Sequence, residues 1–213
     1  MTKPQVDSSH YSYASYEVKS RFASYWHQID EILRLNPQNT LEVGVGSSFV
    51  STYLKSLGLK VATYDIDPAL APDVVGSVET LPFQDAAFDV VAAFQVLEHL
   101  PFERLPGILR EFSRVSRSHL VLSLPDRRRF ARFLVDFYPL VRKEISFPIP
   151  QLHPKEHRFD GEHFWELGKK GYPISALEAS FSDSGWVLSR EYRVPEKPFH
   201  HFFVLKRRGG GGG

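Results

Sequence analysis

The sequence contains no cysteine, and its charges almost cancel: 26 lysines and arginines oppose 25 aspartates and glutamates, for a formal net charge of +1. Without cysteine, disulfides, thiolate metal sites and a cysteine nucleophile are excluded. A near-neutral chain also lacks the basic excess that is typical of nucleic-acid binders. We therefore expect neither disulfides nor general nucleic-acid binding, without excluding local basic patches.

Long apolar runs are also missing. None reaches the roughly 18 residues that a membrane span needs, so no transmembrane span is expected. The first twenty residues are polar and lack the apolar core of a signal peptide. These absences predict a cytoplasmic protein. The glycines at 209–213 offer no side chains for packing, and we expect them to form a disordered tail.

The length of 213 residues, of which 42% are hydrophobic, suits one α/β domain over 1–208. Apolar residues at helical spacing predict an N-terminal helical cap over about 10–36, clearest at 16–35. Within it, Tyr25 and Trp26 are candidates either to cap an active site or to pack on the sheet, and we favour packing for Trp26.

Short apolar runs then alternate with helical segments. The runs lie at 40–46, 60–64, 73–75, 88–94 and 119–124, and the helices between them at 49–57 and 102–115. This alternation implies a parallel sheet with right-handed crossovers.

The C-terminal part continues the sheet. A capping box of Ser175 and Glu178 predicts a helix through 183. Strands at 186–194 and 200–205 follow without a crossover helix, which makes the last strand antiparallel. The predicted fold class is α/β: a doubly wound, seven-stranded, mostly parallel sheet (last strand antiparallel) with helices on both faces.

The alternation breaks at 126–161, which we interpret as an insertion after the fifth strand, too short for a core of its own. It opens with three arginines at 127–129, followed by apolar residues that include Phe130 and Phe133. We expect these residues to form a helix that covers the core and exposes a basic face to solvent. A grip on a phosphate-bearing or membrane-linked substrate remains the alternative.

Two glycines, Gly44 and Gly46, follow the first strand. They permit a sharp turn and let a ligand approach the backbone, and the next helix presents its free N–H groups to the same crevice. Asp65 ends the second strand, where a carboxylate can accept both hydroxyl hydrogens of an adenosine ribose. The pattern predicts an adenosine cofactor at this edge of the sheet.

Two details favour one cofactor over another. A dinucleotide fingerprint requires a third glycine where Phe49 stands. Glu42 lies two residues before Gly44, where its carboxylate would repel a pyrophosphate and attract a cation. S-adenosylmethionine carries a sulfonium and an ammonium and no phosphate, so the charge favours it over NAD.

Four segments, in order and at the usual spacing, resemble class I methyltransferases, in particular the group typified by ubiquinone-biosynthesis enzymes (methyltransferase type 11). The resemblance spans about 41–124, and a weaker similarity runs from 161–163 through 185–186. It implies a Rossmann-like fold with S-adenosylmethionine as the cofactor. The matching segments are Glu42-x-Gly44-x-Gly46, Tyr64-Asp65-Ile66-Asp67, Gly76 to Phe83 with Phe88-Asp89-Val90-Val91, and Phe94 to Leu100.

Carried onto this chain, the resemblance assigns the cofactor-binding residues. It implies that Glu42, Gly44 and Gly46 line the methionine part of the cofactor. Asp65 would hold the ribose, and Ile66 would lie beside the adenine.

Ser77 and Val78 would approach the adenine edge, and Gln95 would close over the methyl-donor region. The family usually has a glycine or another small residue at the position of Ser48, and commonly an aspartate at that of Ser77. Both departures bear on the affinity for the cofactor.

Three histidines are candidate substrate bases. His99 follows the fourth strand at the mouth of the crevice and titrates near neutrality; a solvated helix start is the alternative. His157 and His163 are the second choice.

No metal is predicted. Some ubiquinone-type O-methyltransferases bind a metal through a similar segment that begins with a further glutamate, and Gln95 stands there in this chain. His153, His157 and His163 fit no compact helical pair of ligands.

The sequence thus predicts methyl transfer from S-adenosylmethionine to an O or N atom of a small or medium metabolite, or of a glycan or lipid precursor. The substrate is expected between the N-terminal helix, the segment after His99 and the insertion. Two alternatives stay open: a non-catalytic S-adenosylmethionine-binding regulatory domain, and, less favoured, an NAD-dependent oxidoreductase.

Overall fold

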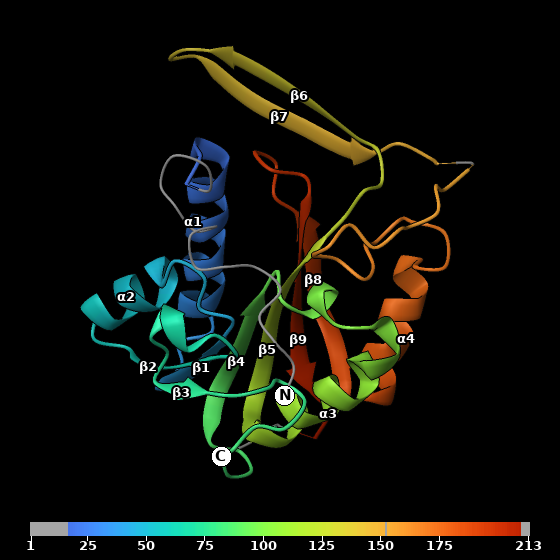
Figure 1. Ribbon diagram of the computed structural model, residues 1–213. Helices are drawn as coiled ribbons and strands as arrows, with labels where there is room; N and C mark the ends of the chain where they lie inside the picture. Colours follow the sequence, from blue (N-terminus) through green and yellow to red (C-terminus); the bar gives the residue numbers. More distant parts are fainter. Residues whose placement is uncertain (1–16, 152, 210–213) are drawn as a thin grey trace.

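The computed structural model describes residues 17–151 and 153–209 (Figure 1). Its helices are α1 (Lys19–Arg34), α2 (Phe49–Ser56), α3 (Leu105–Val115) and α4 (Ile174–Asp183), with short 3-10 turns η2 (Pro68–Leu70), η3 (Leu97–His99) and η4 (Phe102–Arg104). Its strands are β1 (Asn39–Val43), β2 (Lys60–Asp65), β3 (Val74–Val75), β4 (Phe88–Phe94), β5 (Ser116–Pro125), β6 (Phe130–Phe137), β7 (Val141–Pro148), β8 (Trp186–Arg193) and β9 (His200–Arg207).

Seven of the strands form one sheet in the order β3-β2-β1-β4-β5-β9-β8. All neighbouring pairs are parallel except the two that involve β9, which runs antiparallel to β5 and to β8. The predicted fold class is therefore confirmed, including the antiparallel last strand. The chain order reverses beside β1, so the carboxyl ends of β1, β2 and β4 meet at the edge where ligands bind in such sheets.

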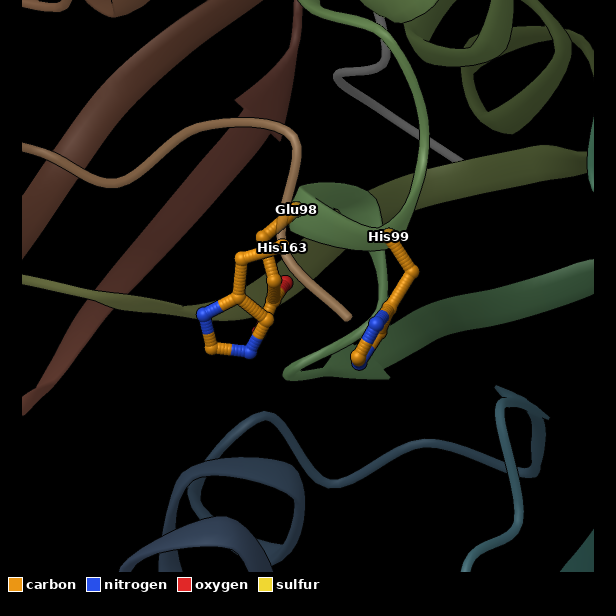
Figure 2. Close-up of side chains that lie close together, drawn as sticks. All are labelled: Glu98, His99 and His163. Atoms are coloured by element: carbon orange, nitrogen blue, oxygen red, sulfur yellow. The ribbon is translucent and has the colours of Figure 1, made fainter. Parts of the chain in front are cut away.

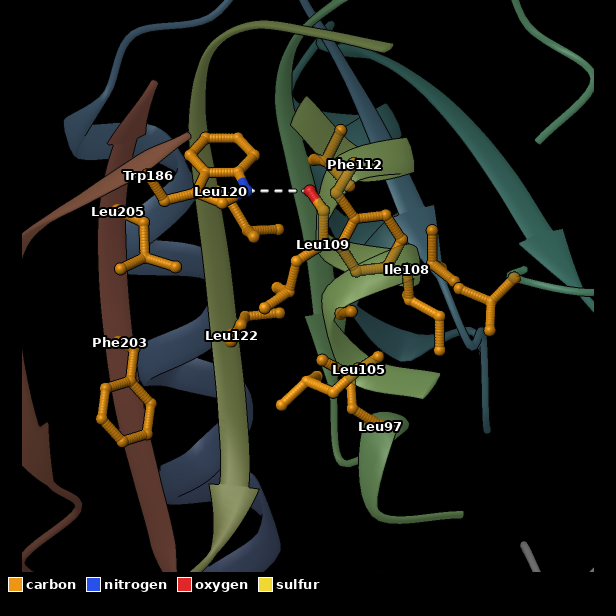
Figure 3. Packing of buried hydrophobic residues seen from close by; sticks show 14 of the residues in the cluster. Leu97, Leu105, Ile108, Leu109, Phe112, Leu120, Leu122, Trp186, Phe203 and Leu205 are labelled. Carbon is orange, nitrogen blue, oxygen red and sulfur yellow. Dashed lines mark hydrogen bonds between the residues drawn. The ribbon is translucent and has the colours of Figure 1, made fainter. Parts of the chain in front are cut away.

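Helices cover both faces of this sheet. Alternate residues of β4 point to opposite sides: Val91 joins the core formed with α3 and α4, whereas Val90 joins the core formed with α1 and α2. Figure 3 shows α3 packed against β5, where the Trp186 indole Nε1 donates a hydrogen bond of 3.0 Å to the carbonyl of Leu109. The two layers hold the strand ends rigidly in place.

Several helix starts differ from the sequence-based expectation. The capping box is wrong: α4 begins at Ile174 after Pro173, without a side-chain cap, because the φ of proline already suits a helix entrance. Helix α3 begins at Leu105 with Pro106 in its first turn, which confirms the first of the two outcomes expected from Pro106-Gly107, a late start or a kink. Of the predicted cap over 10–36, the helix begins at Lys19, and 10–16 lie outside the described residues, as do 210–213 of the glycine tail.

The packing expected of Trp26 is also wrong. Its side chain is 58% exposed, whereas the neighbouring Tyr25 is buried. The helical spacing identified the helix correctly, but a wide aromatic stripe did not reveal which ring faces inward.

The chain leaves the sheet after β5. The helix expected over the arginines and the following apolar residues is wrong, because β6 and β7 form a two-stranded antiparallel hairpin that stands clear of the main sheet (Figure 1). Apolar residues alternate along β6 with period two, which suits a strand. The chain then returns to the main sheet through residues 149–151 and 153–173 before α4 begins.

Candidate functional site

The turn after β1 requires glycine. The Gly44 N–H donates to the carbonyl of Tyr64 at 2.8 Å, which ties the turn to the end of β2. Gly44 has a φ of +80°, and a Cβ added there would lie 2.3 Å from Cγ2 of Val96. Gly46 and Ser48 also have positive φ values, of 49° and 58°. The backbone of residues 44–48 therefore forms a tight turn just before the start of α2.

A pocket lies against this turn, and helix α1 forms one of its walls. The hydroxyl of Tyr25 lies 2.9 Å from the Ser47 Oγ, which joins α1 to the turn. The pocket thus brings together three of the predicted cofactor residues. Its lining is Arg21, Tyr25, Gln28, Glu42, Gly44, Val45, Gly46, Ser47, Phe49, Val50 and Phe94.

Glu42 gives this pocket a buried acid. Its side chain is 3% exposed, and Oε2 has no hydrogen-bond partner among the described residues. Burial raises the pKa of Glu42 to about 7, against the lowering effect of hydrogen bonds from Ser51. A cationic ligand would compensate the buried carboxylate, whereas a phosphate would not. The pocket therefore fits a ligand with an ammonium or sulfonium group.

Asp65 lies at the end of β2, beside the glycine turn. Its Oδ2 accepts from the Val45 N–H at 2.8 Å, and its Oδ1 accepts from the Asp67 N–H at 2.9 Å. Burial raises the pKa of Asp65, although these backbone hydrogen bonds oppose the shift. Each oxygen keeps a lone pair that can accept from a ligand hydroxyl. Ile66 follows, half-buried.

The segment after β3 lies against the same strand end. The hydroxyl of Tyr64 donates to the Ser77 carbonyl at 3.0 Å. A Cβ on Gly76 would lie 2.1 Å from that hydroxyl, so glycine permits the approach. Ser77 Oγ lies 3.4 Å from Glu79 Oε2, and Val78 is buried. Both predicted adenine-edge residues therefore lie beside the β2 end.

Gln95 follows β4 in the left-handed region, with a φ of +56°. Its N–H donates to the Ser123 carbonyl at 2.9 Å, and its side-chain Nε2 to the Ser123 hydroxyl at 3.3 Å. These two bonds fix Gln95 between the ends of β4 and β5. The structure does not include it in the pocket that Glu42, Gly44 and Gly46 line.

A second group of side chains forms where the chain around residue 164 docks on the segment after β4. The Phe164 N–H donates to the Glu98 carbonyl at 2.8 Å, and the buried Trp165 Nε1 donates to the Leu100 carbonyl at 3.0 Å. The Nδ1 of His99 lies 3.0 Å from the carbonyl of Glu162 and donates to it. Residues about 65 positions apart are thereby brought together.

Glu98, His99 and His163 form this cluster (Figure 2). Their potential ligand atoms lie within 4.8 Å of one another, and the two imidazole rings are 5.1 Å apart. Glu98 is fully buried, and within the described part of the chain neither of its carboxylate oxygens has a hydrogen-bond partner. Burial raises the pKa of Glu98 to about 8. Burial also lowers the pKa of His99.

His163 is paired with a second acid. Its Nδ1 lies 3.1 Å from Glu166 Oε1 and donates to it. Burial opposes a charge on His163, but the hydrogen bond to Glu166 and the nearby Glu98 outweigh it and raise the pKa of His163. For Glu166, burial is outweighed by His163 and by Arg127, whose Nε lies 3.0 Å from both carboxylate oxygens, and the pKa falls to about 2. The imidazole is therefore oriented by a carboxylate that stays ionised.

His157 supports this pair. Its Nε2 donates to the carbonyl of His163 at 2.8 Å, and its Nδ1 lies 3.8 Å from Glu166 Oε2. Both ring nitrogens thus face protein groups. The structure brings all three predicted histidines into one neighbourhood, with His163 at its centre.

Two overlapping sets of residues have spacing that suits a cation. One is the cluster of Glu98, His99 and His163, and the other combines Asp160, His163 and Glu166. The expectation of a metal-free site remains a prediction.

Two residues of the site were not singled out from the sequence. Arg21 lines the pocket from α1, on the same helix face as Tyr25, and their spacing of four positions could have identified it. Glu166 offered no such signal, because its importance comes from burial and from contacts across the fold.

A turn of this kind after β1, an acid after β2 and the strand order define a Rossmann-like nucleotide-cofactor domain. Residues 41–122 match the family model described as a methyltransferase domain. This match covers less than half of the chain, and it supports the predicted S-adenosylmethionine-dependent methyltransferase and its cofactor. No curated protein matches the chain in sequence.

Solved structures share the whole fold at low sequence identity. A protein of Pyrococcus horikoshii OT3 is 12% identical with a TM-score of 0.60, covering 94% of this chain and 98% of that chain. The 1,6-didemethyltoxoflavin-N1-methyltransferase of Burkholderia thailandensis, with bound 1,6-didemethyltoxoflavin and S-adenosylhomocysteine, is 13% identical (TM-score 0.58; 89% and 78% covered). A sugar N-methyltransferase from Streptoalloteichus is 12% identical (TM-score 0.58; 87% of each chain covered). At such identities the likeness establishes the fold.

None of the helices in the described ranges is long and apolar enough to cross a bilayer.

Proposed function

We propose that the protein methylates an O or N atom of a small or medium metabolite, or of a glycan or lipid precursor, and that His163 accepts the proton released by the acceptor. The observation that carries this proposal is the His163–Glu166 pair at the end of β4. A base of this kind is needed when the acceptor must lose its proton before or during the transfer.

The cofactor-holding residues follow from the pocket and from the neighbouring end of β2. Glu42 would meet the positive charge of the cofactor, Gly44 and Gly46 would let it approach the backbone, and Asp65 would accept from its ribose. Bound S-adenosylmethionine supplies a methyl group that its sulfonium already activates. The tasks left to the chain are to hold the acceptor in line, exclude water and take up a proton.

His163 suits the last task. Glu166 accepts from Nδ1, which fixes the tautomer and makes Nε2 the nitrogen that takes up a proton. The ionised Glu166 also stabilises the imidazolium that forms on protonation. Ser77, Val78 and Gln95 complete the cofactor side in this proposal, and His99 and His157 hold the surroundings of His163.

The class of acceptor is supported by charge and by the structural neighbours. The net charge of +1 offers no general nucleic-acid footprint. One neighbour is described as acting on a toxoflavin precursor and another on a sugar, both at nitrogen. In this proposal a small acceptor lies between the cofactor and His163.

The test combines cofactor binding with a panel of acceptors. S-adenosylhomocysteine formation is measured with phenols, amino sugars, nucleosides and a nucleic-acid control. His163→Gln should lower kcat by about a hundredfold or more and leave the affinity for S-adenosylhomocysteine unchanged. The matched control is His153→Gln, an exposed histidine of the same segment, which should leave both unchanged.

The pH profile separates a base from a structural residue. Because the base must be neutral and its pKa is raised, wild-type kcat should increase with pH through an apparent pKa above the ordinary 6.5. Glu166→Gln should move this inflection down. A His163→Gln variant with full turnover and an unchanged profile would refute the base, and turnover of the nucleic-acid control alone would refute the acceptor class.

A further inference from the structure

The β6–β7 hairpin has one polar and one apolar face. Side chains alternate along an antiparallel pair, and directly opposed residues share a face. Residues 133, 135 and 137 of β6 therefore share a face with 141, 145 and 147 of β7, and all six are large and apolar. The only charged residue on this face is Lys143, opposite Val135. Each of the six apolar side chains is between 46% and 66% exposed.

The polar face is turned toward the rest of the molecule. Arg132 pairs with Glu144 at 2.9 Å on this face, and its Nη2 lies 3.9 Å from Glu196 in the loop between β8 and β9. The guanidinium of Arg193 lies 4.7 Å from the ring centre of Phe130, at the base of the same face. The apolar face consequently points away from the main sheet, in keeping with the hairpin's position in Figure 1.

The exposed apolar surface is large. With the tip residues Tyr138 and Leu140, 91% and 75% exposed, the hairpin offers on the order of 1,000 Å² of apolar area, comparable to the roughly 800 Å² per partner of a stable interface. Patches of this size on soluble proteins mark interaction sites. An isolated two-stranded hairpin is also only marginally stable in water, so this one gains stability when another surface covers its apolar face.

We propose that the cover is a second copy of this chain, with the apolar faces of two hairpins packed against each other about a twofold axis. An almost uncharged face is complementary to itself, and a twofold interface uses the same patch on both copies. Among the described strands, β6 and β7 pair only with each other, and packing two hairpins face to face leaves their outer backbone edges in contact with water. A lipid surface would cover the face and leave the backbone edges unpaired, which is unfavourable in an apolar medium.

The test starts from the mass of the full chain, measured by light scattering over a range of concentrations. The wild type should be a dimer. The Phe133→Ser/Ile145→Ser variant removes two directly opposed residues of the apolar face and should raise the dimer dissociation constant by about a hundredfold or more. Leu134→Ser, on the other face of the same strand, is the matched control and should remain dimeric. Binding of S-adenosylhomocysteine verifies that each variant is folded.

A crosslinking arm remains informative even if the serine variant loses its hairpin. Because the chain has no cysteine, a single introduced thiol reports on one position. Val135→Cys should crosslink between copies through a short bismaleimide, and Leu134→Cys should crosslink far less. A monomeric wild type, a dimer unaffected by the serine pair, or equal crosslinking at 134 and 135 would overturn the proposal. Pelleting of a monomeric wild type with phosphatidylcholine–phosphatidylglycerol vesicles would assign the face to a bilayer instead.

Discussion

Around the glycine turn after β1, positions are held by backbone atoms, whereas around His163 they are held by charged side chains. Gly44 bonds to the Tyr64 carbonyl, and the Asp65 carboxylate accepts from two backbone N–H groups. His163 instead depends on Glu166, which is in turn held by Arg127.

This difference in how positions are held matches a difference in the tasks proposed for the two regions. The cofactor region must present one shape to one ligand, and close backbone packing provides a fixed shape. In the proposed function, the region around His163 must hold a proton and release it, which requires ionisable groups whose pKa values differ. Mutations should therefore act through strain and packing in the first region, and through charge and pH in the second.

The largest effect is expected at the turn. Gly44→Ala combines a left-handed φ with a contact of 2.3 Å to Val96, so the chain must shift around the pocket. We expect a loss of about 3 kcal/mol in the free energy of unfolding and loss of S-adenosylhomocysteine binding. Urea unfolding and a ligand titration measure the two.

Gly58→Ala is the matched control. Gly58 has a similar φ of +86°, but nothing lies within 4 Å of an added Cβ. Strain alone should cost about 1 kcal/mol, with ligand binding intact. Equal losses at the two glycines would show that close packing does not set the cofactor region apart.

The sequence correctly predicted where the glycine turn and Asp65 lie in the fold, whereas their contacts with the cofactor stay a prediction. Gly44, Gly46 and Asp65 follow strands directly, so their positions follow from the alternation of strands and helices and from the shared edge of a parallel sheet. Glycine and acid spacing are local signals. They remain readable without any knowledge of distant contacts.

The region after β5 could not be predicted in the same way. Arg127 was interpreted as part of a helix face, but its partner Glu166 lies 39 positions away, and such a pairing has no local signature. The capping box at Ser175 failed for a related reason, because Pro173 and tertiary packing determine where α4 begins. The hairpin was missed because the three arginines and the apolar residues after them were interpreted together as one helix face, and the period-two pattern of β6 was not considered.

The next largest effect is expected at Glu166, whose ionisation makes the free energy of unfolding depend on pH. Its pKa of about 2 lies below the ordinary 4.5, so its contribution to stability is present above 4.5 and is lost as the pH falls toward 2. Allowing for screening by water, this contribution is on the order of 2 kcal/mol. Glu166→Gln should lower the free energy of unfolding by that amount at pH 7 and flatten its decline between about pH 5 and 2.

Glu156→Gln provides the comparison for this charge effect. Glu156 pairs with Lys170 at 2.9 Å, but both side chains are 67% exposed, so removal should cost at most about 0.5 kcal/mol. Urea unfolding at a series of pH values measures both variants. If the two glutamates behave alike, the region around His163 is not organised by buried charge.

The smallest effect is expected from removing the hairpin. The Ile149 N–H donates to the Arg129 carbonyl at 2.9 Å, so the two strands meet at their base. Ala131 and Phe147 are directly opposed, and an Asn-Gly turn can join them in place of 132–146. Because the hairpin contributes no residue to the pocket, the affinity for S-adenosylhomocysteine should stay within about twofold of the wild type. Calorimetric titration measures it, and a loss of more than about tenfold would mean that the two regions are coupled through the hairpin.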